Sequence, residues 1–377
     1  PCVQIHTVRF IYAVHLCHRA AFVDRRYRRF HLDTLFTRLL VGRCSYHLTM
    51  PGFVGFVSLK HLAKVGSILK KKAKPFLKWA GGKRQLLCQF EKYYPDDLSG
   101  GIIEKYIEPF VGGGAVFFEI IQKYSIKYSH INDINRDLII TYHVIKKKPD
   151  FLLETLQKYQ SDYNNADEQD RKNIFFSVRN NFNVNRLEID DSIFSENWIK
   201  RAAQFIFLNK TCFNGLFRLN SNGEFNVPFG GYKNPNIFDK DNILAVSEVL
   251  QDTRIEISNY DNCFDFANEK TFVYFDPPYR PISRTASFTT YTGFEFNDIE
   301  QIKLSQFFKK IDTQKRSKLM LSNSDIKNYN KSDDFFGKLY FGYKFHLVYA
   351  RRTINCNSEK RGKINELVIT NYGFKNE

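Results

Sequence analysis

Long apolar runs and paired cysteines are both absent from this sequence. No stretch approaches the ~18 to 20 consecutive apolar residues that a helix needs to cross a bilayer, so no membrane-spanning helix is predicted. The seven cysteines are odd in number and scattered, without a CxxC pair, so the pattern indicates neither a disulfide framework nor a zinc site. We therefore expect no metal site, no membrane partner and a reducing, cytoplasmic environment.

Lysine is absent from the first 49 residues. This region holds eight arginines, five of the nine histidines and three of the seven cysteines, whereas every lysine lies at or after Lys60 and the first methionine is Met50. The region has no convincing cleavage site and is not rich in serine, which argues against a signal or transit peptide. We interpret residues 1–49 as a non-native or disordered extension, with a DNA-binding arm as the alternative and Met50 as a candidate start.

Acidic residues are too few to balance the basic ones. Lys and Arg number 56 against 40 Asp and Glu, and the resulting net charge of +16 favours a polyanionic partner, nucleic acid before a membrane surface. A length of 377 residues with 43% hydrophobic residues indicates an ordinary globular protein of two or three domains. Residues 50–74 contain six of the lysines, and we interpret this segment as a basic linker.

The most informative stretch is a β-forming run that two prolines interrupt. Residues 271–275 predict a buried strand, and Pro277 and Pro278 must end it because neither has a backbone N–H and each restricts φ. The turn therefore holds a carboxylate, a rigid carbonyl and an aromatic ring at the carboxyl end of a strand, where α/β sheets bind ligands. Asp276 and the Pro277 carbonyl can accept the two N–H groups of an exocyclic amine while Tyr279 stacks on the ring. The alternative is a plain strand followed by a proline-rich turn.

A second stretch predicts a cofactor site. Residues 106–121 read as strand, glycine-rich turn and helix, and a further strand over Tyr128–Ile131 ends at Asp133, which is placed to bind ribose hydroxyls. Phe117 stands where a dinucleotide fingerprint needs its third glycine, which favours S-adenosylmethionine, a cofactor without pyrophosphate, over NAD. Upstream, a glycine pair precedes a helix expected from Arg84. These features predict the cofactor half of a Rossmann-like sheet.

The middle and the end of the chain show other patterns. Residues 151–210 are typical of helices, and a turn at Ser221–Glu224 predicts a hairpin. Aromatic and basic residues on that hairpin suit contact with base edges and phosphates, and the alternative is an ordinary hairpin that packs its aromatics inward. Further predicted elements are a mobile lid over Thr285–Gly293, a helix over Ile299–Ile311, a strand over Leu319–Asn323, an antiparallel pair of Lys344–Ala350 and Glu366–Tyr372, and a basic loop at the DNA between the members of that pair.

Several short motifs occur in a characteristic order. They are Phe76–Lys83, Glu108–Gly114, Asn132–Asp133, Asn214–Arg218, Gly223–Gly230 and Asp276–Tyr279, with further counterparts at Arg351–Ile354 and Asn365–Leu367. Over residues 75–372 the sequence thereby resembles the Dam-type N6-adenine DNA methyltransferases (D12 class, alpha group), including the modification enzymes of GATC-type restriction systems. The resemblance implies an α/β fold, a Rossmann-like S-adenosylmethionine-dependent methyltransferase sheet of residues 75–145 and 251–377. A helical and hairpin target-recognition domain, residues 146–250, would be inserted into it.

The resemblance also implies roles for individual residues. The catalytic turn that receives the adenine would be Asp276, Pro277, Pro278 and Tyr279. S-adenosylmethionine would be bound by Trp79, Lys83, Glu108, Phe110, Gly112, Gly114, Asp133 and Asp276. DNA would be contacted by Lys78, Phe213, Asn214, Arg218, Pro228 and Tyr232. The counterpart of Arg218 reads a guanine, but Gly231 stands where some relatives have arginine and Phe213 replaces a tyrosine, so GATC is expected without being secured.

The expected function is transfer of a methyl group from S-adenosylmethionine to N6 of an adenine flipped out of duplex DNA. The expected partners are double-stranded DNA and a cognate restriction endonuclease acting on the same site, in a bacterial or phage-type setting. Three alternatives remain. The first is a cytosine-N4 methyltransferase, which usually has serine before the two prolines, where this sequence has Asp276. The second is a non-catalytic DNA-binding protein on the same scaffold. The third is a nucleotide-binding oxidoreductase, which Phe117 disfavours.

Overall fold

The computed structural model describes residues 49–50, 53–54, 71–280, 296–328, 330–351 and 363–373. The chain divides into two compact units, Pro1–Lys70 and Lys71–Glu377. In the first unit, β1 (Thr49–Met50) pairs antiparallel with β2 (Phe53–Val54). Residues 1–48, most of the linker, the expected lid and most of the basic loop lie outside the described residues. In the described part of the chain, no helix has both the length and the apolar character to span a membrane.

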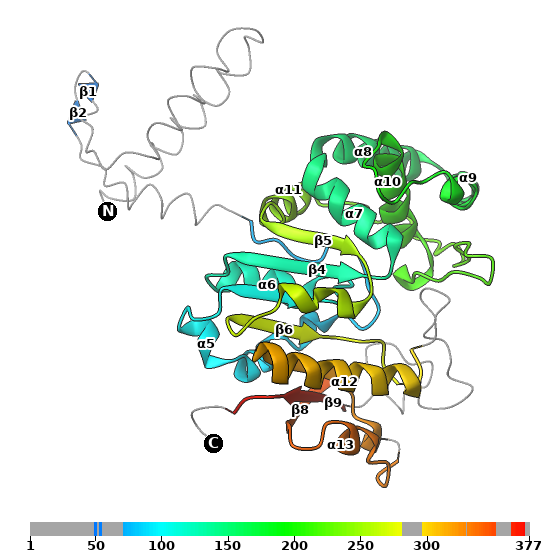
Figure 1. The fold of residues 1–377 in the computed structure, drawn as a ribbon. Helices are drawn as coiled ribbons and strands as arrows, with labels where there is room; N and C mark the ends of the chain where they lie inside the picture. Colours follow the sequence, from blue (N-terminus) through cyan, green and yellow to red (C-terminus); the bar gives the residue numbers. More distant parts are fainter. Residues whose placement is uncertain are drawn as a thin grey trace. The chain divides into compact units, whose positions relative to one another are not determined.

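A seven-stranded sheet forms the centre of the second unit (Figure 1). Its order is β5-β4-β3-β6-β7-β9-β8, in which the first five strands are parallel and β9 is antiparallel to both neighbours. The chain steps outward from β3 to β5 and then returns to place β6 beside β3, so β3 and β6 flank the topological switch point, where α/β sheets bind ligands. The strands are β3 (Lys105–Glu108), β4 (Tyr128–Asp133), β5 (Thr253–Ile257), β6 (Thr271–Phe275), β7 (Lys318–Ser324), β8 (Lys344–Arg351) and β9 (Lys363–Thr370).

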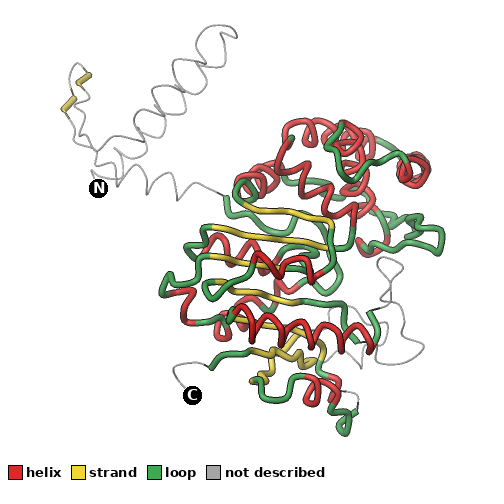
Figure 2. The backbone as a smooth tube through the Cα atoms, in the orientation of Figure 1, coloured by secondary structure: helices red, strands yellow, loops and turns green. Residues whose placement is uncertain are grey.

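The central strand β6 is buried along its whole length. A parallel strand that is covered on both faces carries a continuous apolar run, which explains why its five residues show no polar alternation. Phe272 and Tyr274 belong to one core and Val273 and Phe275 to the other. Helices α6 (Ala115–Lys123) and α7 (Arg136–Lys147) contribute to the first core, and α12 (Asp298–Lys315) to the second. Figure 2 shows the strands as a layer flanked by helices, which confirms the predicted α/β fold.

Helices α8 (Pro149–Asn165), α9 (Glu168–Val184) and α10 (Glu196–Thr211) form the cluster that Figure 1 shows in green beyond β5. The predicted helical character of residues 151–210 is therefore confirmed. Arg201 of α10 donates to both carboxylate oxygens of Asp137 on α7, over 2.7 and 3.0 Å, with only 4% of the arginine side chain exposed. This buried ion pair fastens the helical insertion to the helix that begins just after β4. Helix α11 (Lys240–Val249) leads the chain back to the sheet.

The predicted hairpin is present, but an isolated bridge between Leu219 and Phe225 replaces regular strands. The side chain of Asn183 on α9 takes the place of a neighbouring strand: its Oδ1 accepts from the Phe225 N–H at 2.8 Å and its Nδ2 donates to the Phe225 carbonyl at 3.1 Å. Phe217 and Phe225 are buried. The expectation that these aromatics are presented outward was wrong, because they pack against the helical cluster.

Other elements also differ from expectation. The helix expected from Arg84 is a 3-10 turn, η1 (Lys83–Gln85), followed by the short helix α4 (Leu87–Phe90). Strand β9 begins and ends earlier than predicted, and β5 was not predicted. The short strand β5 lies at an edge of the sheet and interleaves Arg254 and Glu256 with its apolar residues, so it lacks the apolar run of β6.

Candidate active site

The turn after β6 places Asp276 at the switch point of the sheet. The Asp276 Oδ1 atom lies 2.8 Å from Lys83 Nζ and accepts a hydrogen bond from Ser322 Oγ at 3.1 Å. Lys83 is 3% exposed and also donates to the Gly81 carbonyl at 2.7 Å, so the glycine pair before η1 helps to aim the ammonium group. Burial raises the pKa of Asp276, and the nearby ammonium and hydroxyl groups oppose that shift. The carboxylate is thus held in place by two donors from distant parts of the chain.

Tyr279 is fixed at both ends. Its hydroxyl donates to Glu366 Oε2 at 2.6 Å, and its ring centroid lies 4.7 Å from Lys83 Nζ. Burial raises the pKa of Tyr279 well above its usual value, so the hydroxyl stays protonated near neutral pH. Ser322 and Glu366 were not among the predicted site residues, although Glu366 lies in the Asn365–Leu367 motif.

The backbone on either side of Tyr279 is also held. Gln301 of α12 donates from Nε2 to the Pro278 carbonyl at 3.0 Å. Arg280 binds both carboxylate oxygens of Asp298, at 2.5 and 2.7 Å, and one oxygen of Asp333, at 2.8 Å. These contacts tie the turn to α12 and to the segment after β7. The two-proline turn is therefore a rigid platform.

The glycine-rich turn after β3 wraps around the Asp133 carboxylate. The Gly112 N–H donates to Asp133 Oδ2 at 3.1 Å, and the Asn135 N–H donates to Oδ1 at 2.9 Å. Gly112 and Gly114 have φ values of +47° and +71°, in the left-handed region that favours glycine. Burial raises the pKa of Asp133 to about 6, and the backbone donors oppose the shift. The carboxylate therefore closes the turn while it stays able to accept further hydrogen bonds.

Trp79 covers the same turn. A Cβ atom on Gly112 would come within 2.8 Å of the Trp79 indole, so the ring lies directly against the glycine backbone. The indole also stacks on Phe217, with ring centroids 6.2 Å apart and planes 19° apart, and it lies 6.4 Å from Phe205. Trp79 thereby joins the glycine-rich turn to the hairpin.

Two further predicted cofactor residues have different surroundings. Glu108, at the end of β3, is 2% exposed and accepts from the Tyr106 hydroxyl at 2.5 Å. Burial raises the pKa of Glu108 well above its usual value, and the charge of Asp276 adds to the shift. Phe110 instead stacks on Tyr260, with centroids 5.5 Å apart, as part of the core on the α12 side. The structure therefore brings Glu108 to the Lys83 and Asp276 pair and places Phe110 behind the turn.

The predicted DNA residues gather around the end of α10. The Phe213 N–H donates to the Pro228 carbonyl at 2.9 Å, and the Asn214 N–H donates to the Tyr232 hydroxyl at 3.2 Å. Lys78 Nζ lies 5.0 Å from the Tyr232 ring centroid. The Phe213 side chain is 52% exposed. These five residues form one exposed surface.

Arg218 lies on the hairpin, where Asn226 holds its side chain. Its Nε donates to Asn226 Oδ1 at 2.7 Å and its Nη2 to the Asn226 carbonyl at 3.4 Å. The guanidinium is therefore oriented by the opposite arm of the hairpin. This arrangement depends on the tertiary structure of the hairpin, and Asn226 was not among the predicted site residues.

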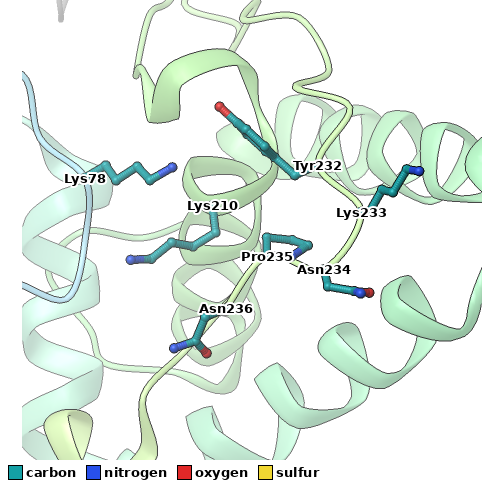
Figure 3. Close-up of a pocket in the computed structure, with 7 residues that line it drawn as sticks. All are labelled: Lys78, Lys210, Tyr232, Lys233, Asn234, Pro235 and Asn236. Carbon is teal, nitrogen blue, oxygen red and sulfur yellow. The ribbon is translucent and has the colours of Figure 1, made fainter. Parts of the chain in front are cut away.

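Three lysines line one pocket beside this surface, and Figure 3 shows Lys78 and Lys210 extending toward the same region while the ammonium group of Lys233 points away from them. The pocket has a volume of about 460 Å³ and is lined by Lys78, Lys210, Tyr232, Lys233, Asn234, Pro235 and Asn236. Burial, together with the charge of Lys78, lowers the pKa of Lys210 to about 8. Cationic and amide donors around a small hollow suit an anion such as a phosphate. Lys210 and Lys233 were not predicted, although Lys210 comes three residues before Phe213 and Lys233 directly follows Tyr232.

Comparison with known proteins identifies the family. The sequence matches the family of D12 class N6 adenine-specific DNA methyltransferases over residues 79–354. The chain belongs to this family. The assignment confirms the predicted resemblance and removes the cytosine-N4 and oxidoreductase alternatives, and this D12 methyltransferase is an enzyme that methylates adenine in DNA.

Individual relatives extend over most of the methyltransferase. The type II methyltransferase M.MjaIII of Methanocaldococcus jannaschii is 50% identical over 300 residues, which cover 79% of this chain and 99% of that protein. The type II methyltransferase M1.LlaDCHI of Lactococcus lactis is 37% identical over 302 residues, 80% of this chain and 96% of that protein. The DNA adenine methylase of Haemophilus influenzae is 34% identical over 300 residues, 79% and 94% of the two chains.

Proposed function

We propose that this methyltransferase moves a methyl group from S-adenosylmethionine to N6 of an adenine that is flipped out of duplex DNA, in a target of the GATC type. The observation that carries the proposal is the Asp276 carboxylate at the switch point, held 2.8 Å from Lys83 with the glycine-rich turn of β3 alongside. An adenine amine cannot be reached inside the stacked duplex, so the base must leave it.

The turn after β3 fits S-adenosylmethionine. Gly112 carries no side chain where a Cβ would collide with Trp79, and Asp133 offers a carboxylate to ribose hydroxyls. Asp276 adds a carboxylate, and the buried Glu108, whose raised pKa favours its neutral form, adds a hydrogen-bonding carboxyl group. Bound there, the cofactor would supply a methyl group on a sulfonium that leaves as a neutral thioether.

The catalytic turn would act by positioning and electrostatics. Lys83 and Ser322 both approach Asp276 Oδ1, and we assign Oδ2 to one hydrogen of the adenine amine. The Pro277 carbonyl would accept the other hydrogen, since the Pro278 carbonyl accepts from Gln301. Two such bonds draw the amine lone pair out of the ring and toward the methyl group. As the N–C bond forms, the S–C bond of the sulfonium breaks, and the amine would lose one proton to its hydrogen-bond partner, Asp276 Oδ2. Methyl transfer by this route requires neither a metal nor a covalent enzyme intermediate.

The surface around α10 and the hairpin would bind the duplex. We assign a backbone phosphate to the pocket of Lys78, Lys210 and Lys233, because phosphate contacts position a protein on DNA without reading sequence. Arg218, oriented by Asn226, would read a guanine, for which a forked guanidinium is well suited. In this proposal residues 146–250 are the target-recognition domain, and residues 75–145 and 251–377 are the catalytic domain.

A restriction endonuclease acting on the same site is the proposed functional partner. Two relatives, M.MjaIII and M1.LlaDCHI, carry the name type II methyltransferase, which supports a protective role beside such a nuclease. The test is whether expression of the methyltransferase protects cellular DNA from a nuclease of the same specificity. If the enzyme fully methylates a different site and the cellular DNA is still cut by the nuclease, this assignment is wrong.

The deciding experiment measures methyl incorporation from labelled S-adenosylmethionine into duplexes with GATC, with a one-base variant, or without adenine in the site. Label only in the GATC duplex is the expected result. Label in the variant as well would mean that the enzyme accepts a changed base, and Arg218 and Gly231 would then be the residues to test for specificity. Asp276→Ala should lower turnover by at least about 10²-fold, the size of effect seen when a key electrostatic group is removed. Asp265→Ala, at a side chain that is 98% exposed, is the matched control. Near-normal turnover by Asp276→Ala would overturn the mechanism.

A further inference from the structure

Glu366 reaches the catalytic turn from the last strand of the sheet. Strand β9 runs antiparallel to β7, so its beginning lies at the edge where the parallel strands end, and Glu366 pairs with Ser324 there. From that position its Oε2 accepts the hydrogen of the Tyr279 hydroxyl at 2.6 Å. If β9 ran parallel to β7, its first residues would lie at the opposite edge of the sheet, and Glu366 could not reach Tyr279.

The contact controls the remaining freedom of the Tyr279 ring. The backbone before Tyr279 is held by Gln301, and the residue after it is held by Asp298 and Asp333. With the backbone fixed, only the two side-chain torsions of Tyr279 can change the plane of the ring. The hydroxyl oxygen lies on the long axis of the ring, so its hydrogen bond fixes the direction of that axis, which χ1 sets. The phenolic O–H prefers to lie in the ring plane, so pointing it at Glu366 also favours one value of χ2.

The protonation states suit this contact. Burial raises the pKa of Tyr279, which keeps the hydroxyl a donor, and burial raises the pKa of Glu366, while Lys83 opposes the latter shift. Either protonation state of the carboxyl leaves an oxygen that can accept. The hydrogen bond therefore depends on an acceptor at this position and not on its negative charge.

We propose that Glu366 is a positioning residue of the methyltransferase: it holds the Tyr279 ring in the plane that stacks on the flipped adenine. The proposal rests on the proposed role of Tyr279 as the stacking surface. A ring that is free to rotate presents the correct plane only part of the time, and a 1 Å misplacement can cost a large factor in rate. We expect about a tenfold loss of kcat when the bond is removed, which is the upper end of what one hydrogen bond contributes.

The test compares Glu366→Leu, Tyr279→Phe and the double variant, which all lack the bond, with Glu366→Gln, whose amide oxygen retains the acceptor. Each variant without the bond should lose about tenfold in kcat with little change in the KM for S-adenosylmethionine, and Glu366→Gln should recover most of the loss. The double variant should lose no more than either single variant, because both remove one contact. Tyr343→Phe is the matched control, since that hydroxyl donates to Asp312 Oδ2 at 3.0 Å away from the turn.

A second readout is the fluorescence of 2-aminopurine placed at the target adenine, which is quenched when the base stacks on an aromatic ring. Glu366→Leu should reduce the quenching, and Tyr343→Phe should not. Losses of kcat that multiply in the double variant, or Glu366→Gln as impaired as Glu366→Leu, would overturn the proposal. Tyr279→Phe preserves the size of the ring and tests the same bond independently of how well Glu366→Leu folds.

The fluorescence also distinguishes a failure of the role assigned to Tyr279 from a failure of the role assigned to Glu366. If Tyr279→Ala leaves the 2-aminopurine signal unchanged, the assigned stacking role of Tyr279 fails and the proposed function must be revised. If Tyr279→Ala changes the signal and Glu366→Leu does not, only the role of Glu366 fails.

Discussion

Replacing Gly112 by alanine tests how the glycine-rich turn and Trp79 build the cofactor site. Gly112 has a φ of +47°, and an added Cβ would come 2.8 Å from two atoms of the Trp79 indole. The left-handed backbone alone costs about 1–2 kcal/mol in a residue with a side chain. Displacing a packed ring adds about 1–3 kcal/mol. The expected loss in the free energy of unfolding is therefore about 2–5 kcal/mol, the sum of the two effects.

The matched control is Gly101→Ala. Gly101 has a φ of +68°, in the same region, but a Cβ there would meet no atom within 4 Å. Only the backbone term applies, so this variant should lose about 1–2 kcal/mol. The comparison isolates the contact with Trp79, because both substitutions add the same methyl group to the same kind of backbone.

Urea denaturation and calorimetric titration with S-adenosylmethionine provide the measurements. Gly112→Ala should be the less stable variant and should bind the cofactor at least about tenfold more weakly, since the Gly112 N–H also supports the Asp133 carboxylate. Gly101→Ala should bind the cofactor normally. Equal stabilities for the two variants, or normal cofactor affinity in Gly112→Ala, would refute the packing argument.

Three further outcomes follow from charges in the structure. Burial lowers the pKa of Lys210 to about 8. DNA affinity measured by fluorescence anisotropy should therefore be full below that pH and fall above it, and Lys210→Arg should remove the dependence because arginine stays charged. Burial raises the pKa of Asp133 to about 6. Cofactor affinity should therefore be full above that pH and fall below it, as the protonated carboxyl becomes a poorer acceptor; a pH-independent affinity would remove Asp133 from the site. Arg201→Met should cost about 3–5 kcal/mol in urea denaturation, because it leaves Asp137 buried without its partner, and Arg201→Met with Asp137→Leu should recover much of this loss.

Local patterns in the sequence predicted the elements whose signal lies within a few residues. The β-forming run before two prolines predicted β6 over its observed residues, and the spacing of glycines before an apolar helix predicted the turn after β3. The edge strand β5 was not predicted, although Thr253, Ile255 and Ile257 alternate with Arg254 and Glu256 in the pattern typical of a half-buried strand. The hairpin was predicted, but the direction of its aromatics was not, because only tertiary packing brings Phe217 against Phe205 and Phe225 against Phe182.

The amino-acid sequence by itself therefore determined the chemistry of the catalytic turn: an acid, two prolines and a tyrosine at the end of a strand can present a carboxylate, a carbonyl and a ring because those constraints are local. Only the tertiary structure decided which groups hold that turn. Lys83 meets Asp276 because η1 packs against α6, the helix that follows β3, and β3 is the neighbour of β6. Glu366 meets Tyr279, 87 residues away in the sequence, because β9 reverses direction against β7. Contacts of this kind depend on strand order and direction, which no short stretch of sequence encodes.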